Sequence, residues 1–290
     1  MIIDSNRSVK TFVLQKQQDM KRIKAKDEIS LFYKDMGTGK PVVFVHGWCI
    51  NCDSWEYIMD SITESGYRCI AYDQRGCGRS DQSWTGYDYK SLAADLDVLL
   101  NTLALNEVTL VGHSLGGGVI AQYLADYGEE RIKSAVIIST TIPGMMKNDD
   151  NPEGLDIALY EMAVEFMKKD RASYTYGLAE NFFNLKESNV SKEMVDWSLA
   201  ITMQASSRAA VEMLNTALNS SQVEELKKIN TPFLILHGDK DVNCPIPLTA
   251  DKTQKLLKNS QLKIYKDQPH GMYISEPQMI SADILEFIAD

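Results

Sequence analysis

The run 108–118, VTLVGHSLGGG, passes from an apolar segment into a glycine-rich turn, and the residues beyond it are apolar at helical spacing. Its first residues, 108–111, have the composition of a strand that is buried on both faces. A chain that changes from strand to helix over so few residues must turn sharply at Ser114. Gly112 and Gly116 remove the side chains that would collide in such a turn. The run therefore predicts an α/β fold that holds Ser114 between the end of a strand and the start of a helix.

The same alternation of short apolar runs and amphipathic segments continues along the chain. Further buried strands are expected at 41–45, 69–72, 134–138, 231–236 and 261–265, and a hairpin strand within 23–36. Helical spacing occurs at 54–65, 91–103, 248–257 and 280–289. Strands that alternate with helices predict a mostly parallel, twisted sheet with helices on both faces.

The alternation stops after the strand that ends near Ile138. From 142 to about 225 only helical patterns occur, at 155–168, 171–184, 192–205 and 207–218. A helical insertion at this place predicts a cap over the carboxyl edge of the sheet. We therefore expect core residues 1–141, a helical cap at 142–226 and a second core segment at 227–290. Residues 1–22 form an N-terminal extension with a strand-like patch at Val9, Phe12 and Leu14, for which an arm, an edge strand and an oligomer contact all stay open.

Composition narrows the kinds of partner. A net charge of -10 argues against nucleic acid, since phosphate binding needs a basic face. The five cysteines are an odd number, and neither a signal-peptide pattern nor an apolar run long enough to span a bilayer is visible. We expect a reduced, cytoplasmic protein without a membrane partner.

Ser114 has the position of a nucleophile, but a serine hydroxyl needs a base to remove its proton. The candidates are His46, His113, His237 and His270. His113 is adjacent to Ser114 on the turn and should point away from the hydroxyl, while His46 and His237 directly follow strands. His270 lies in a loop beyond the last predicted strand, between Pro269 and Gly271, and is the favoured base.

The base needs a carboxylate that fixes its tautomer, and two backbone N–H groups should meet the developing oxyanion. Asp241 is the favoured acid because it follows a strand and precedes His270, while Asp239 and Asp267 stay open as alternatives. The expected oxyanion donors are the N–H groups of Leu115 and Trp48. Trp48 follows the strand at 41–45.

Several motifs together resemble the α/β-hydrolase superfamily. They are His46-Gly-Trp48, Asp73-x-Arg-Gly-x-Gly-x-Ser80, Gly112-His-Ser-Leu-Gly116, His237-Gly-Asp-x-Asp241 and Pro269-His-Gly271. The segments Trp55-Glu-Tyr57, Arg79-Ser-Asp-Gln82 and 266–271, with 168–172 and 195–197 in the cap, are similar to bacterial arylesterases and cofactor-free haloperoxidases. The resemblance implies the α/β-hydrolase fold, the triad of Ser114, Asp241 and His270, and an oxyanion hole from Trp48 and Leu115.

The resemblance further implies hydrolysis of small aryl or short-chain carboxylic esters without a metal or organic cofactor. Relatives of this kind commonly form homo-oligomers. Those that make peracids from hydrogen peroxide tend to carry proline after the oxyanion-loop tryptophan, where this chain has Cys49, which favours plain hydrolysis. Perhydrolysis, lactone hydrolysis and a non-catalytic receptor for a small ligand remain the alternatives.

The sequence also suggests which residues line the substrate pocket and how two further motifs are used. Pocket residues are expected at Trp48, Cys49, His113, Met145, Trp197 and Met272. Cys49-x-x-Cys52 has no second Cys or His pair at metal-binding spacing, so no metal or redox site is expected. The glycines of 73–80 are interpreted as a structural bend with Arg75 and Arg79 as ion-paired supports, because the segment lacks a phosphate-loop ending.

Overall fold

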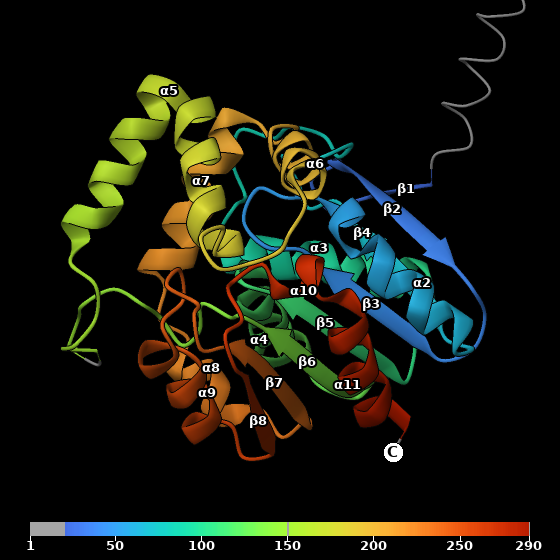
Figure 1. The fold of residues 1–290 in the computed structure, drawn as a ribbon. Helices are drawn as coiled ribbons and strands as arrows, with labels where there is room; N and C mark the ends of the chain where they lie inside the picture. Colours follow the sequence, from blue (N-terminus) through green and yellow to red (C-terminus); the bar gives the residue numbers. More distant parts are fainter. Residues whose placement is uncertain (1–20, 150, 290) are drawn as a thin grey trace, which may run out of the picture.

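The computed structural model describes residues 21–149 and 151–289, and within them an eight-stranded sheet forms the centre of the molecule (Figure 1). The strands are β1 Arg22–Lys24, β2 Ser30–Met36, β3 Pro41–Val45, β4 Arg68–Tyr72, β5 Val108–His113, β6 Ile132–Ile138, β7 Phe233–Gly238 and β8 Ser260–Tyr265. Their order across the sheet is β1-β2-β4-β3-β5-β6-β7-β8. β2 pairs antiparallel with β1 and β4, and the remaining neighbours pair in parallel. The mostly parallel sheet expected from the sequence is confirmed.

Helices cover both faces of this sheet, as the alternating pattern predicted. They are η1 Cys52–Trp55, α2 Glu56–Glu64, α3 Tyr89–Thr102, α4 Leu115–Tyr127, α8 Val223–Lys228, η2 Ile246–Leu248, α9 Ala250–Leu256, α10 Met272–Ser275 and α11 Pro277–Ala289. Successive side chains of a strand point to opposite faces. In β3, Val43 therefore packs with α3 and α4, whereas Phe44 packs against Trp55 on the face covered by α2 and α11. Because both faces of the sheet are buried, a central strand such as β3 is apolar along its whole length.

Three helices between β6 and β7 lie together above the sheet: α5 Ile157–Phe183, α6 Lys192–Thr202 and α7 Ser207–Asn219 (Figure 1). The sequence predicts α5 as two helices, and the structure breaks it at Asp170, which has φ -154° and ψ 82°. The Asp170 side chain accepts a hydrogen bond from the Ser173 N–H at 2.9 Å, as an N-cap does. The second half of α5 therefore starts as a helix of its own.

The predicted strand-like patch at Val9, Phe12 and Leu14 lies outside the described residues. The description begins at residue 21, just before the hairpin of β1 and β2. Among the helices of residues 21–149 and 151–289, none is long and apolar enough to cross a bilayer. The boundaries of the three expected domain segments stay a prediction.

Candidate active site

Ser114 occupies the sharp turn between β5 and α4. Its backbone has φ +52° and ψ -119°, a conformation that non-glycine residues rarely adopt. Two contacts explain the flanking glycines: a Cβ at Gly116 would collide with the Val45 carbonyl, and one at Gly112 would lie 2.8 Å from the Gly116 carbonyl. The Ser114 N–H donates to the Ile138 carbonyl at 2.9 Å, which ties the turn to the neighbouring strand β6. The turn expected from the sequence is confirmed, and packing on both sides holds it.

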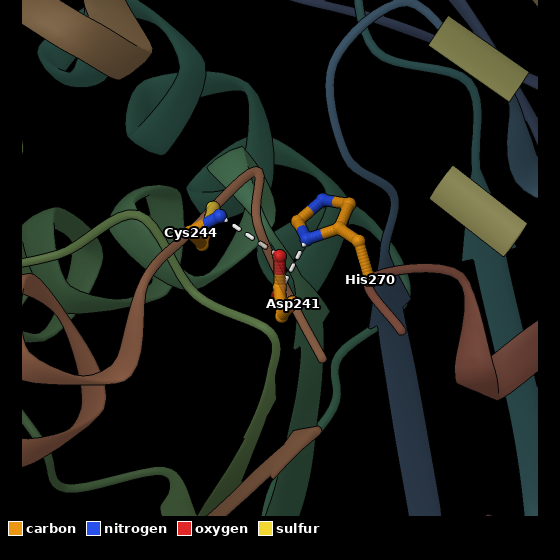
Figure 2. Close-up of side chains that lie close together, drawn as sticks. All are labelled: Asp241, Cys244 and His270. Atoms are coloured by element: carbon orange, nitrogen blue, oxygen red, sulfur yellow. Dashed lines mark hydrogen bonds and ion pairs between the residues drawn. The ribbon is translucent and has the colours of Figure 1, made fainter. Parts of the chain in front are cut away.

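Asp241 and His270 meet across the loops that follow β7 and β8 (Figure 2). The Asp241 Oδ2 atom accepts a hydrogen bond from His270 Nδ1 at 2.8 Å, and both side chains are buried. The other oxygen, Oδ1, accepts the N–H groups of Asn243 at 3.0 Å and Cys244 at 2.8 Å. With the Nδ1 proton held by Asp241, His270 presents Nε2 as its basic nitrogen.

His237 is a second histidine that contacts the Asp241 carboxylate. Its Nε2 atom donates to the Cys244 carbonyl at 2.8 Å and lies 3.2 Å from Asp241 Oδ2. Burial alone would raise the pKa of the Asp241 carboxyl, but the charge of His270 and the hydrogen bonds from both histidines hold that pKa well below its usual range. Asp241 is therefore an anion whose contacts are all satisfied. Asp239, the nearest alternative, instead accepts the Asp267 N–H at 2.6 Å.

The other two histidines also have structural partners. Burial holds the pKa of His113 well below its ordinary value, so its Nε2 atom donates as a neutral ring to the His270 carbonyl at 3.2 Å. His113 thereby supports the loop that carries His270. Burial likewise lowers the pKa of His46, whose Nδ1 donates to the Gly47 carbonyl at 2.8 Å and whose Nε2 accepts the Gln74 N–H at 2.9 Å. Of the four histidines, His270 alone pairs through Nδ1 with a carboxylate, and it lines the same cavity as Ser114.

The loop after β3 passes close to Ser114 at Gly47, the residue before Trp48. A Cβ added to Gly47 would lie 3.2 Å from the Ser114 Cβ. Cys49 has φ +55°, and the Ile50 N–H donates to the Trp48 carbonyl at 2.8 Å, so these residues form a γ-turn of the rare, positive-φ kind. Within the described residues, no protein group accepts from the N–H of Trp48 or Leu115. Neither N–H is therefore used by the fold of this part of the chain.

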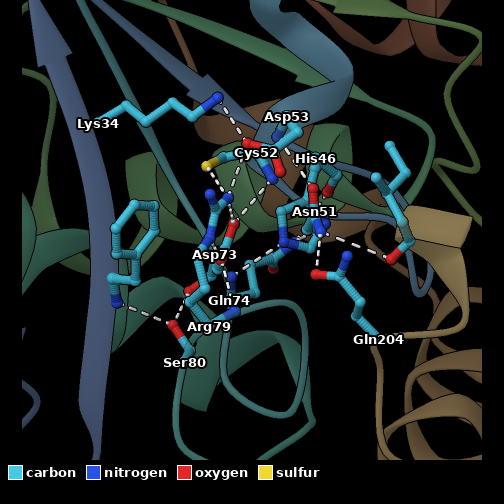
Figure 3. Close-up of polar contacts among 12 residues, drawn as sticks. Lys34, His46, Asn51, Cys52, Asp53, Asp73, Gln74, Arg79, Ser80 and Gln204 are labelled. Carbon is cyan, nitrogen blue, oxygen red and sulfur yellow. Dashed lines mark hydrogen bonds and ion pairs between the residues drawn. The ribbon is translucent and has the colours of Figure 1, made fainter. Parts of the chain in front are cut away.

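A polar network behind this loop fixes its conformation (Figure 3). Asp73 accepts hydrogen bonds from the Cys52 N–H at 2.9 Å and from the Arg79 N–H at 2.7 Å, and it pairs with the Arg79 guanidinium at 3.0 Å. Arg79 continues to Asp53 at 2.8 Å. A similar pair joins the buried Arg75 to Asp95 through two bonds of 2.7 Å. The interpretation of both arginines as ion-paired supports is confirmed.

The cap is bound to the loop after β3 by specific contacts. The Trp48 indole N–H donates to the Ala210 carbonyl of α7 at 2.8 Å, and its ring meets Tyr174 edge to face at 6.3 Å. Asn51 donates to Gln204 at 3.0 Å (Figure 3). These contacts place α5 to α7 over Ser114, so the cap forms a roof over the site.

A cavity of about 470 Å³ lies between this roof and the turn at Ser114. Of the residues expected to line it, Trp48, His113 and Met145 do so. Cys49, Trp197 and Met272 do not, and those three predictions are corrected. Cys49 is buried in the core beneath the loop because its φ is positive, Trp197 packs on Tyr57 outside the cavity, and Met272 is buried with α10.

Sequence reasoning missed Cys244, which lines the cavity and lies beside Ser114. Burial raises the pKa of the Cys244 thiol well above its usual value, and a hydrogen bond with Ser114 only partly offsets this rise. In the described part of the chain, Asp241, Cys244 and His270 are the one group with donor atoms close enough for a metal, within 4.8 Å of one another. Within that group, Asp241 and His270 are already hydrogen-bonded to each other. The available signal was the position of Cys244, three residues after Asp241 in the same loop.

The comparisons with known proteins agree with this geometry. The family model described as alpha/beta hydrolase fold matches residues 40–277. The chain belongs to the α/β-hydrolase family. It is similar to the non-heme chloroperoxidase CPO-A1 of Kitasatospora aureofaciens, with 36% identity over 91% of this chain and 97% of the relative.

Two solved structures superpose closely on the α/β-hydrolase chain. The bromoperoxidase from Bacillus anthracis has a TM-score of 0.89 and 35% identity, covering 93% of this chain and 100% of that one. The esterase EaEST from Exiguobacterium antarcticum has a TM-score of 0.89 and 30% identity, with the same coverage. Haloperoxidase-named and esterase-named proteins thus share this fold, which supports a hydrolase.

Proposed function

We propose that this α/β-hydrolase is a serine carboxylesterase that works through an acyl-enzyme. The observation that carries the proposal is the buried Asp241–His270 pair, of which His270 lines the same cavity as Ser114 on its strained turn. Ser114 Oγ attacks the ester carbonyl carbon while His270 Nε2 takes its proton. The tetrahedral intermediate then collapses, the ester C–O bond breaks, and His270 returns the proton to the leaving alkoxide.

Water completes the cycle by the reverse sequence of proton movements. His270 Nε2 removes a proton from a water molecule, whose oxygen attacks the acyl carbon and releases the carboxylic acid from Ser114. The N–H groups of Trp48 and Leu115 are the proposed donors to the oxyanion in both steps. One such donor is worth about 10²–10³ in kcat. No step requires a metal or an organic cofactor.

Perhydrolysis, in which hydrogen peroxide replaces water, is the second candidate because haloperoxidase-named relatives share the fold. The conformation of Cys49 favours water. Proline has φ near -65°, and the γ-turn at Cys49 has φ +55°, so this loop has a shape that proline cannot adopt. By the resemblance, efficient peracid formation goes with proline at this position.

The proposal is tested with Ser114→Ala and a matched control, Ser281→Ala, which replaces a buried serine of α11. We expect Ser114→Ala to lose p-nitrophenyl acetate hydrolysis by a factor of about 10⁴ or more and to show no p-nitrophenol burst. Ser281→Ala should keep both. Full turnover by Ser114→Ala would refute the mechanism, and a peroxide-dependent rate above the rate with water would favour perhydrolysis.

A further inference from the structure

The cavity above Ser114 is larger than a short acyl group requires. Its volume is about 470 Å³. A water-sized group takes roughly 30 Å³ in a liquid, so the cavity holds on the order of fifteen such groups. An acetyl group would fill only a small part of it and leave the rest of the wall without contacts.

The wall of this cavity is mostly apolar. Among residues 21–149 and 151–289, no Asp, Glu, Lys or Arg side chain lines it. Most of the wall comes from the cap and the loop before it, through residues such as Met146, Leu155, Leu178, Leu199, Leu214 and Leu218. A charged substrate arm would lose its hydration there without gaining a partner. The wall therefore selects an uncharged, apolar arm.

The first half of α5 lies at the outer edge of the cap (Figure 1), and side chains from this part of the helix line the cavity. Leu159 lines the cavity and is also 53% exposed, and Ala163 lines it one turn further along the helix. Beside them, Phe166 meets Tyr174 at 5.7 Å, and Tyr174 meets Trp48 at 6.3 Å. A row of packed aromatic rings thus extends from Phe166 of α5 to Trp48 in the loop after β3.

We propose that the site hydrolyses neutral esters that carry one long apolar chain, of about six to twelve carbons. The ester carbonyl lies at Ser114, and the chain runs along the cap wall toward Leu159. Water cleaves the ester C–O bond as before, and the products are an acid and an alcohol, one of which keeps the long chain. This inference rests on the proposed ester hydrolysis.

A series of p-nitrophenyl acetate, butanoate, octanoate and dodecanoate tests the chain length, with each rate divided by that of alkaline hydrolysis. A buried methylene contributes up to about fourfold in kcat/KM. We expect kcat/KM to rise by about tenfold or more from acetate to octanoate. A fall over this range, with the acetate still hydrolysed, would overturn the inference and leave the esterase proposal intact. Absence of turnover and of a burst with every ester would refute the esterase proposal itself.

The long chain can belong to the acid or to the alcohol, and matched esters distinguish the two. Methyl octanoate is compared with methyl butanoate, and octyl acetate with butyl acetate, all below the concentration at which they aggregate. A higher kcat/KM for the longer member of either pair supports the inference and identifies the arm. Lower values for both longer members overturn it.

Two substitutions on α5 test the path of the chain. Leu159→Asp places a charge where the cavity opens, and Met162→Asp places one on the same helix at a side chain that does not line the cavity. Both side chains are more than half exposed, at 53% and 66%, so both variants should fold. We expect Leu159→Asp to lower the octanoate-to-acetate ratio of kcat/KM by about threefold or more, and Met162→Asp to leave it unchanged. Equal ratios in the two variants would exclude the path along Leu159.

Discussion

Asp241→Asn is the substitution whose effect the hydrogen bonds of the site define best. Oδ1 of Asp241 accepts two backbone N–H groups, from Asn243 and Cys244, at 3.0 and 2.8 Å. A backbone N–H cannot become an acceptor, so the amide oxygen of an asparagine must occupy this side. The amide N–H₂ then faces His270 Nδ1, which is 2.8 Å from the replaced oxygen.

The consequence is a change of tautomer in His270. Its Nδ1 atom must accept from the asparagine amide, so the ring proton moves to Nε2, and Nε2 can no longer take the proton of Ser114. The corresponding change in a serine protease lowers kcat by about 10⁴, which equals about 5 kcal/mol of transition-state stabilisation. We expect a loss of similar size here, with KM nearly unchanged because the cavity wall is not altered.

The assay is steady-state hydrolysis of p-nitrophenyl acetate at pH 7.5, with thermal unfolding to confirm that each variant is folded. Asp239→Asn is the matched control, since Asp239 is two residues away and bonds the Asp267 N–H instead of a histidine. It should keep kcat within about twofold of the unmodified enzyme. A loss below tenfold in Asp241→Asn, or an equal loss in Asp239→Asn, would refute the assignment of the acid.

Four further changes test the surroundings of Ser114. Asp73→Asn turns an amide N–H₂ toward the donors of Arg79, so the free energy of unfolding measured in urea should fall by about 2–3 kcal/mol at pH 7. Although burial opposes it, Arg79 holds the pKa of Asp73 below its usual range. The stability difference should therefore be complete above about pH 5 and shrink as the pH falls further, whereas a constant difference would contradict this ion pair. Trp48→Phe removes the bond to the Ala210 carbonyl and should lower stability by about 1 kcal/mol and raise KM a few-fold; unchanged values of both would show that this bond does not hold the cap. Iodoacetamide at pH 7.5 should not inactivate the folded enzyme within an hour, because four of the cysteines are buried away from the cavity and burial raises the pKa of every thiol, including that of Cys244, which lines the cavity; inactivation at the rate of a free thiol would disprove this. Cys49→Pro should lower kcat/KM at least about tenfold relative to Cys49→Ala, because proline cannot adopt φ +55°, and equal rates would show that the γ-turn is dispensable.

The sequence predicts the sheet well because strands that are buried on both faces consist of nearly continuous apolar residues. The expected strand at 41–45 is observed with the same bounds, and the break in α5 falls between the two helices expected at 155–168 and 171–184. The chain order of strands and helices also restricts the topology, since parallel neighbours need crossover helices. Local pattern and global fold agree in these parts of the chain.

The cavity wall could not be predicted in the same way. Helical spacing identifies an apolar face but not the surface that it packs against, so Trp197 was expected in the pocket although it packs on Tyr57. Cys49 follows Trp48 directly, yet a positive φ turns its side chain into the core. Cys244 reaches the cavity only because the Asp241 loop is folded around the Oδ1 atom. Each of these outcomes depends on contacts between distant segments.

The proposed chemistry and the proposed specificity therefore depend on different parts of the fold. Ser114, Asp241 and His270 follow β5, β7 and β8, and strands of one parallel sheet deliver their carboxyl ends to the same edge. The cavity wall lies mostly on helices that are held to this edge by a few hydrogen bonds, such as those of Trp48 and Asn51. A change in the docking of α5 to α7 would thus alter which esters fit while the Asp241–His270 bond stays intact. For this reason a chain-length profile of ester hydrolysis reports on how the cap is docked, whereas the effect of Asp241→Asn reports on the residues that follow the strands of the core.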